Sequence, residues 1–263
     1  DVVRIAFLGI SEGNLMSYQR KETQKRIAPL ICAALGVVLI VGGCATTANV
    51  QQIDRLDSVG ENPRIILMPP DIRYYLLTAG GVPEPNAEWT DAARVNFGVA
   101  VKDFADQIGS DLRIIDKTNL SEEEIRYDTL HSAVGITLLE NYFGMAKLPS
   151  KRDQFDWSLG PGVSTIGAAH NADYALFAYY RDYQASGGRI AFAVLAAAAV
   201  GAAVPMGAEF GFASLVDLKS GGIVWFNKVD VGAGELRDPD GAAKVVDTLF
   251  RDIPTRTGPG TAQ

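Results

Sequence analysis

Residues 209–229 read EFGFASLVDLKSGGIVWFNKV, and this stretch decides the fold. Two apolar runs, 209–218 and 222–229, are joined by Lys219-Ser-Gly-Gly222, a tight glycine turn. Runs of this length that are rich in apolar and aromatic residues are typical of strands. The stretch therefore predicts a β-hairpin.

Upstream of this hairpin, the apolar spacing alternates between helix and strand patterns. Residues 89–108 and 121–143 repeat apolar side chains at intervals of three and four, which predicts two long helices, the second opened by a Ser121-Glu-Glu-Glu124 capping box. Residues 173–180 are typical of a buried strand, with Arg181-Asp-Tyr183 at its solvent-exposed end. The other predicted elements are strands at 64–68, 71–78 and 111–116, a short helix ending near His170 and a helix at 240–251. This order predicts an α/β fold, a two-layer sandwich of a mixed β-sheet with helices.

An apolar, alanine-rich segment at 190–204 is added to this pattern. It contains no charged residue and is bordered by Gly187-Gly188 and by Pro205. As a helix it would be about 22 Å long at 1.5 Å per residue, shorter than the roughly 30 Å hydrocarbon core of a bilayer. Two interpretations remain open: a helix packed on its own domain or on a neighbouring subunit, or a segment that contacts the membrane.

The amino-terminal segment has the order of a secretory signal peptide. A basic stretch at 17–26 is followed by an apolar run at 27–41 and by Gly42-Gly43-Cys44. The apolar run is short for a membrane span, which needs about 20 residues. A cleaved signal peptide is therefore favoured over an uncleaved transmembrane anchor.

Val41-Gly-Gly-Cys44 resembles the lipobox of bacterial lipoproteins. The resemblance implies cleavage before Cys44 and attachment of acyl chains, palmitate among them, to this cysteine. A single acyl chain binds a membrane only reversibly, so durable anchoring takes more than one. Ala45, rather than an aspartate, follows the cysteine, and the resemblance to enterobacterial lipoproteins then implies the outer membrane rather than the inner one.

These features predict four parts of the chain. Residues 1–43 comprise upstream residues and the signal peptide, and 44–62 form a polar, lipidated tether. Residues 63–254 form a periplasmic α/β domain, and 255–263 form a disordered tail.

Charge and cysteine content exclude some functions of that domain. The net charge of the 263 residues is -7, and residues 1–43 hold five basic and three acidic residues, which leaves 19 basic and 28 acidic residues beyond them. Nucleic-acid affinity depends on clustered Lys and Arg, so nucleic-acid binding is not expected. Cys32 and Cys44 are the only cysteines, so the domain has neither a disulfide nor a thiolate metal site.

Two pairs of motifs carry a family resemblance. NADYALF at 171–177 and ASLVDLKSGGIVWFN at 213–227 resemble the curli-secretion lipoproteins, the penicillin-binding-protein activator lipoprotein and the TolB amino-terminal domain. FDWSLGPG at 155–162 and YRDYQASGGR at 180–189 resemble a group of proteobacterial envelope lipoproteins. The resemblance covers about 63–254 and implies a small α/β domain at the periplasmic face, where relatives assemble pores, activate cell-wall synthases or support export. It implies no catalytic residue.

No pattern in the sequence predicts catalysis. His131 and His170 are the only histidines and do not form an HExxH motif, so a zinc site is not expected. Ser164 lies in a GxSxxG sequence, one residue too long for a nucleophile elbow. Gly160-Pro-Gly162 is better interpreted as a turn than as a dinucleotide-binding loop. We expect no catalytic residue, no metal and no cofactor.

The predicted function is that of a non-catalytic, membrane-anchored envelope lipoprotein that scaffolds or regulates an envelope assembly. Its partners would be the membrane, through the lipid anchor, and an envelope protein or further copies of the chain. The candidate partner-binding residues are Tyr180, Tyr183 and Arg189, where a strand end meets the apolar segment. The alternatives are a pore or export component that uses 190–204 in the bilayer and, less favoured, an envelope hydrolase.

Overall fold

The computed structural model describes residues 47–51, 56, 63–108, 110, 112–151, 154–230, 232–255 and 258–260. The chain divides into two compact units, 1–43 and 44–263, and all described residues belong to the second. The predicted signal peptide and Cys44 lie outside the described residues, so their assignment stays a prediction.

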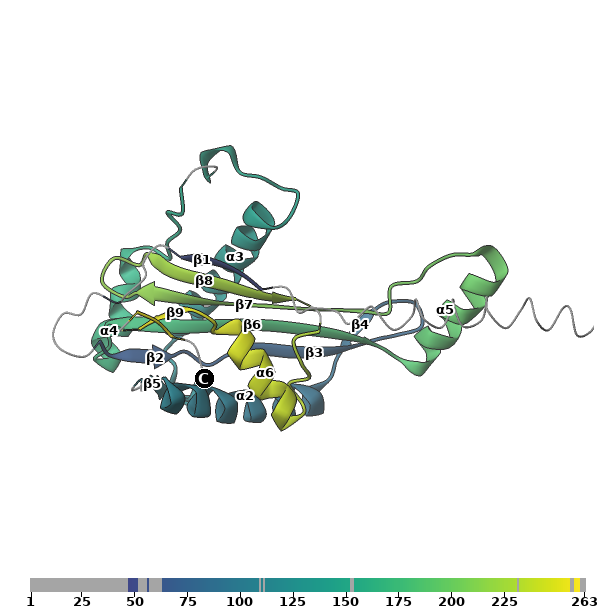
Figure 1. The fold of residues 1–263 in the computed structure, drawn as a ribbon, viewed down its shortest axis with the longest axis horizontal. Coiled ribbons are helices and arrows are strands. Elements are labelled where there is room, and N and C mark those ends of the chain that lie inside the picture. The colour runs from purple at the N-terminus through teal and green to yellow at the C-terminus, as the bar shows by residue number, and fades with distance from the viewer. Residues whose placement is uncertain are drawn as a thin grey trace, which may run out of the picture. The chain divides into compact units, whose positions relative to one another are not determined.

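The described part of the chain begins with four strands, continues with a mixture of helices and strands, and ends with a helix and a short strand pair (Figure 1). Its strands are β1 (Thr47–Gln51), β2 (Ile65–Leu67), β3 (Asp71–Leu77), β4 (Pro83–Pro85), β5 (Leu112–Ile114), β6 (Tyr174–Ala185), β7 (Gly207–Asp217), β8 (Ile223–Asp230), β9 (Ile253–Thr255) and β10 (Gly258–Gly260). Its α-helices are α2 (Ala87–Gln107), α3 (Glu122–Tyr142), α4 (Ser164–His170), α5 (Gly187–Val200) and α6 (Pro239–Leu249). Short 3-10 turns lie at Lys117–Asn119, Pro149–Lys151 and Pro161–Val163.

One mixed sheet contains eight of the described strands, in the order β1-β8-β7-β6-β2-β5 along its main path. β2 and β3 lie one after the other along the same edge of β6 and run parallel to it, separated by Pro69-Pro70. β6, β7, β8 and β1 are antiparallel neighbours. The predicted α/β class with a mixed sheet is confirmed.

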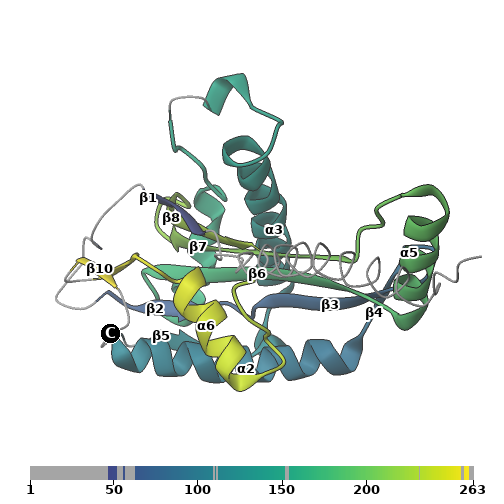
Figure 2. The same cartoon turned by 45° about the vertical axis from the view of Figure 1, so that its right-hand side comes forward.

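Helices cover both faces of this sheet (Figure 2). Successive residues of a strand point to opposite faces, so Leu176 of β6 packs with α2 and α6 while its neighbour Phe177 packs on the side of α3 and α4. Burial on both faces explains why the sequence of β6 is apolar without alternation.

The β7–β8 hairpin confirms the prediction made from residues 209–229. In its turn, Asp217 Oδ1 accepts a hydrogen bond from the backbone N–H of Lys219 at 2.9 Å. Gly221 has a φ of +77°, and a Cβ there would lie 2.1 Å from the carbonyl oxygen of Gly160. Only glycine fits this position, because the φ is left-handed and the neighbouring backbone is too close.

The two long helices are also confirmed. At the start of α3, the Ser121 hydroxyl accepts from the Glu124 N–H at 3.3 Å, and the Glu124 carboxylate accepts from the Ser121 N–H at 2.7 Å, which is the predicted capping box. Further along, Gly135 faces Phe212 of β7 so closely that a Cβ would lie 2.0 Å from the ring. The missing side chain lets α3 approach the sheet.

Several boundaries differ from the prediction. β6 continues to Ala185, and Arg181 and Asp182 are only 6 % and 7 % exposed, so they do not form a solvent-exposed strand end. β3 and β7 flank this half of β6 on both sides and bury it.

The two predicted flexible segments also contain paired strands. Residues 47–51, which the sequence places in the tether, form β1 and pair with β8. Residues 258–260, which the sequence places in the tail, form β10 and pair with β9. Neither strand has an apolar period, because each lies at the edge of its sheet and needs only backbone partners.

Candidate functional site

The α5 projection, which we define as residues 187–206, leaves the sheet where β6 ends and returns where β7 begins (Figure 1). Gln184 of β6 pairs with Gly207 of β7, and Ala185 pairs with Leu77 of β3. α5 is therefore joined to the sheet at the ends of three neighbouring strands.

Both ends of α5 are capped within the chain. The Ser186 hydroxyl accepts a hydrogen bond from the Arg189 N–H at 3.2 Å. At the other end Gly201 adopts the left-handed conformation, with a φ of +66°, and its N–H donates to the Ala197 carbonyl at 3.0 Å. These are the standard ends of a stable helix.

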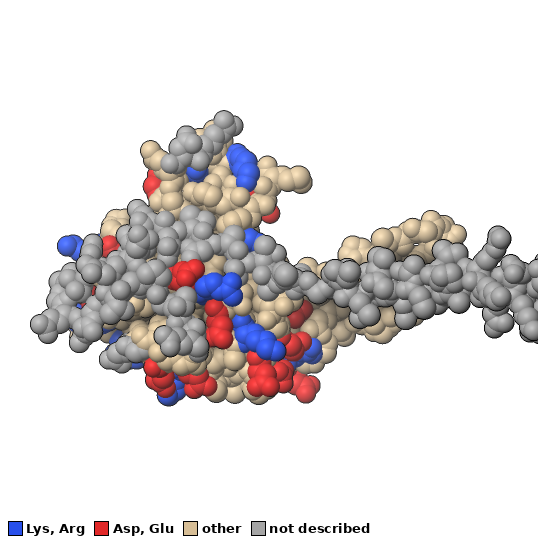
Figure 3. Space-filling model, in the orientation of Figure 1, with Lys and Arg blue, Asp and Glu red and all other residues tan. Residues whose placement is uncertain are grey.

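The surface of α5 is apolar on all sides and exposed to solvent. Its exposed large side chains, with the exposed fraction of each, are Ile190 (48 %), Phe192 (51 %), Val194 (63 %), Leu195 (68 %) and Val200 (77 %). At 100° per residue these side chains point in several directions around the helix axis. The face of the molecule seen in Figure 3 shows no charged side chain on the α5 projection. The expectation that this segment packs on its own domain is therefore wrong; a neighbouring subunit and the membrane remain.

Two of the three candidate partner-binding residues lie at the base of α5. Arg189 is 9 % exposed, and its Nε donates to the Pro205 carbonyl at 2.7 Å. Tyr183 stacks on Tyr75 of β3, with ring centroids 4.8 Å apart. Arg189 thus joins the first turn of α5 to the chain that follows the helix, and Tyr183 joins β6 to β3.

The third candidate, Tyr180, is a core residue rather than a surface one. It is 1 % exposed, and its hydroxyl donates to a carboxylate oxygen of Glu209 at 2.6 Å. A partner cannot reach it without unfolding the strand. Of the three candidates, Tyr180 therefore belongs to the core, whereas Tyr183 lies near the end of β6 and Arg189 lies in the first turn of α5.

β1 fixes the point where the chain that follows Cys44 enters the sheet. Thr47 pairs with Val229, Val229 with Gly211, and Gly211 with Tyr180. Across these three antiparallel pairings β1 runs opposite to β6, and β6 runs toward α5. Three residues of chain span at most about 10 Å. The amino-terminal end of β1, three residues after the predicted lipidation site, therefore points toward the end of the sheet that carries α5.

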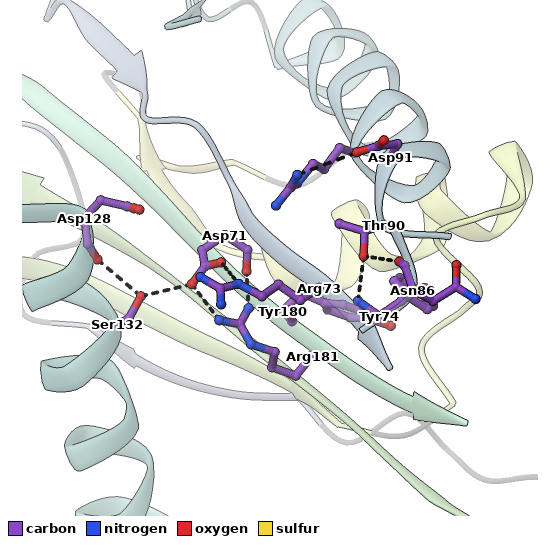
Figure 4. A network of polar contacts seen from close by, with 11 residues as sticks. Asp71, Arg73, Tyr74, Asn86, Thr90, Asp91, Asp128, Ser132, Tyr180 and Arg181 are labelled. Atoms are coloured by element: carbon purple, nitrogen blue, oxygen red, sulfur yellow. Dashed lines mark hydrogen bonds and ion pairs between the residues drawn. The ribbon is translucent and has the colours of Figure 1, made fainter. Parts of the chain in front are cut away.

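A buried ion pair joins β3 to β6 on the side of α3 (Figure 4). Arg181 Nη2 lies 2.6 Å from Asp71 Oδ2, and the guanidinium lies over the Tyr179 ring at 3.9 Å from its centroid. Arg73 donates to the other carboxylate oxygen of Asp71 at 3.0 Å. Burial alone would raise the pKa of Asp71, but the hydrogen bond and charge of Arg181, together with Arg73, lower it overall.

Asp128 of α3 is a second acid near this pair. Burial, and then the negative charge of Asp71, raise its pKa to about 6. One turn further along α3, Ser132 donates to the Asp128 carbonyl at 3.2 Å and lies 3.5 Å from Asp71 Oδ2. Because Arg181 is fixed between a carboxylate and an aromatic ring, the arrangement is that of a structural ion pair connecting β3, β6 and α3.

A second polar cluster lies on the opposite face, beside α2 and α6. Its members, joined by hydrogen bonds and charge, are Tyr74, Asp182, Gln184, Glu209, Glu235 and Arg237. Burial would raise the pKa of Glu235, but hydrogen bonds from Arg237 and Tyr74 lower it to about 2. Burial raises the pKa of Asp182 to about 6, and the charges of Glu209 and Glu235 add to this effect.

We expect Asp182→Asn to raise the free energy of unfolding at pH 7 by about 1–3 kcal/mol, since one pKa unit corresponds to about 1.4 kcal/mol. The pKa of Asp182 is higher in the folded than in the unfolded state, so its ionisation destabilises the fold at pH 7. This destabilisation fades as the pH falls toward 3.8, the ordinary pKa of the group. Asparagine keeps an oxygen for the Gln184 amide, which donates at 3.2 Å.

Urea unfolding at pH 7 and pH 4 measures this prediction. The gain should nearly vanish at pH 4, and an equal gain at both pH values would contradict it. Asp247→Asn, on the exposed side of α6, is the matched control and should change stability little at either pH.

A serine and a histidine are in contact inside the molecule, where a substrate cannot reach them. His131 Nε2 lies 2.9 Å from Ser214 Oγ, and the two residues are 1 % and 0 % exposed. Burial lowers the pKa of His131 to about 3, so the imidazole is neutral. Ser164, by contrast, is exposed at the start of α4. The buried pair is a polar contact between α3 and β7, and its geometry does not support the hydrolase alternative.

The polar clusters were not predicted from the sequence. Arg181 stands between aromatic residues in an apolar strand, which was a signal for a buried charge, but its partner Asp71 lies 110 residues away in the chain. Among the residues that the structure describes, no group of three or more His, Cys, Asp or Glu side chains is placed to hold a metal ion.

No helix in the described ranges is both long and apolar enough to cross a bilayer.

No family model and no curated protein matches the chain. Solved structures that share some similarity include a PelC dodecamer from Paraburkholderia phytofirmans (11 % identity, TM-score 0.35, 78 % of this chain and 97 % of that one). They also include lipoprotein GNA1162 from Neisseria meningitidis (10 % identity, TM-score 0.27, 64 % of this chain and 80 % of that one). A further example is the LpoB C-terminal domain from Salmonella enterica (10 % identity, TM-score 0.27, 66 % of this chain and 87 % of that one).

Proposed function

We propose that this chain is a non-catalytic, lipid-anchored envelope protein whose α/β domain scaffolds or regulates an envelope assembly. The observation that carries the proposal is the position of β1. A basic stretch, an apolar run and Gly42-Gly43-Cys44 precede it, and the chain enters the sheet at Thr47, only three residues after the cysteine. Acyl chains on Cys44 would therefore hold the folded domain directly at a membrane surface.

The proposed location is the periplasmic side of the envelope, with the outer membrane favoured by Ala45. The acidic balance beyond residue 43 does not favour nucleic-acid binding. The exposed α5 projection supports a role that depends on contact, since a large exposed apolar surface marks an interaction site.

Metabolic labelling with an alkyne palmitate analogue in a diderm bacterium tests the anchor. The wild-type chain should incorporate the label into its membrane-bound, shortened form. Cys44→Ser should lose the label and keep the signal peptide, because the cysteine is both the acyl acceptor and the residue at the cleavage site. Cys32→Ser is the matched control and should be labelled like the wild type. Label retained by Cys44→Ser would overturn the proposal.

Chemical cross-linking in intact envelopes tests the scaffold role. We expect one defined complex, either with an envelope protein or between copies of the chain. A lipidated chain that stays monomeric and uncross-linked over the whole range of reagent would contradict this part of the proposal and leave the anchor in place.

A further inference from the structure

We infer that the α5 projection inserts into the same bilayer that holds the lipid on Cys44, and so forms a second, protein-made membrane contact. The inference rests on the proposed lipid anchor. It differs from a pore, because α5 has 14 residues and a length of about 21 Å, which does not cross the roughly 30 Å hydrocarbon core.

The first argument is the distribution of apolar side chains around α5. Ile190, Phe192 and Leu195 point in different directions, and each is about half exposed or more. A flat protein partner, or the α5 of a second copy, covers one side of a helix and leaves the other in water. Lipid surrounds a helix, so it covers all of these side chains at once.

The second argument is the geometry of the sheet. Thr47 is level with Tyr180 in the register, and β6 runs five residues further, about 17 Å, before α5 begins. Cys44 can reach at most about 10 Å in the same direction. The start of α5 therefore lies about 7 Å or more beyond the lipid attachment point. When the strands run along the membrane normal and the acylated cysteine is at the membrane surface, α5 lies on the hydrocarbon side of that cysteine.

The third argument is that Arg189, the one charged side chain of α5, is buried against the protein. The Arg189 guanidinium donates to the Pro205 carbonyl at 2.7 Å and is packed beside Gly81, where a Cβ would lie 2.7 Å from Nη1. Ser186 and Gly201 cap the helix ends. Insertion of α5 therefore leaves no charged side chain of the helix in hydrocarbon.

Depth-dependent fluorescence quenching on the full lipoprotein tests the inference. The mature chain has no thiol other than Cys44, which is acylated, so Ala198→Cys in α5 can be labelled with an environment-sensitive dye. The labelled protein is reconstituted into phosphatidylethanolamine and phosphatidylglycerol vesicles with or without doxyl-labelled lipids. We expect a blue-shifted emission that doxyl lipids quench severalfold. The same dye at Asp103→Cys, exposed on α2, should be neither shifted nor quenched.

Two substitution pairs separate lipid contact from general effects. Phe192→Asp with Leu195→Asp should abolish the quenching at position 198 while the protein stays in the membrane through its lipid. Val95→Asp with Val99→Asp, equally exposed on α2, should leave the quenching unchanged.

The outcomes are distinct. Emission at position 198 that stays water-like would overturn the inference. A blue shift without quenching by doxyl lipids would also overturn it and would indicate that a second copy of the chain covers α5. Loss of palmitate labelling would overturn the anchor, which is measured separately and does not depend on the dye.

Discussion

Arg181→Met is expected to lower the free energy of unfolding at pH 7 by about 3–5 kcal/mol, the range for removing one partner of a buried ion pair. Arg181 is the partner that keeps Asp71 charged inside the fold, since burial alone would raise the pKa of Asp71. Its guanidinium also donates to the Asp71 and Tyr180 carbonyls, at 2.5 and 2.9 Å. Methionine fills much of the volume but leaves these acceptors and the carboxylate without their donor. Arg73 remains beside Asp71, so the loss should lie nearer 3 than 5 kcal/mol.

A double-mutant cycle isolates the charge effect from the packing effect. Asp71→Asn removes the buried charge, so Arg181→Met should cost much less in that background than in the wild type. Urea unfolding of the four proteins at pH 7 gives the coupling energy. Costs of Arg181→Met that are equal in the two backgrounds would show that the ion pair contributes nothing.

Replacing His131 with glutamine is expected to remove a large part of the acid sensitivity of the fold. Burial lowers the pKa of His131 from 6.5 to about 3 in the folded state. Below pH 6.5 the unfolded chain takes up a proton at this site and the folded chain does not, so stability falls as the pH falls toward 3. The slope of a single group is about 1.4 kcal/mol per pH unit, and the total approaches 4–5 kcal/mol across this interval.

The measurement is the free energy of unfolding from pH 7 to pH 4 for the wild type, His131→Gln and His131→Met. Glutamine keeps a polar group that can bond to Ser214. Methionine has no such group and only fills the space in which the imidazole stacks on Phe177. Both variants should be less stable than the wild type at pH 7, and this deficit should shrink steadily toward pH 4. A deficit that is constant with pH would refute the assignment of a neutral, buried imidazole.

Features that depend on nearby residues could be predicted from the sequence. The β7–β8 hairpin follows from the glycine turn at 219–222, and α3 follows from the capping box and the apolar spacing within one segment. These signals are local because a turn or a helix end is made by residues a few positions apart.

Features that depend on residues far apart in the chain could not be predicted from the sequence. Arg181 was assigned to a solvent-exposed strand end because charge usually marks the surface, and only the fold shows that Asp71 neutralises it. β1 could not be predicted, because an edge strand is held by backbone hydrogen bonds to its neighbour, and these place no requirement on its side chains. Tyr180 and Tyr183 are three positions apart in β6 and so point to opposite faces of the sheet; Tyr180 lies in the core, and Tyr183 stacks on Tyr75 of β3.

The antiparallel pairing of β1 with β8 has a mechanical consequence. A pull on the lipid proposed at Cys44 would enter the described part of the domain at Thr47 and act along the axis of β1. Under such a load the hydrogen bonds of the β1–β8 ladder are sheared together rather than opened one after another, because they lie across the direction of the force. The domain would thus resist being drawn away from its anchor by sharing the force over the whole strand, while the same strand could be peeled off readily from its Gln51 end.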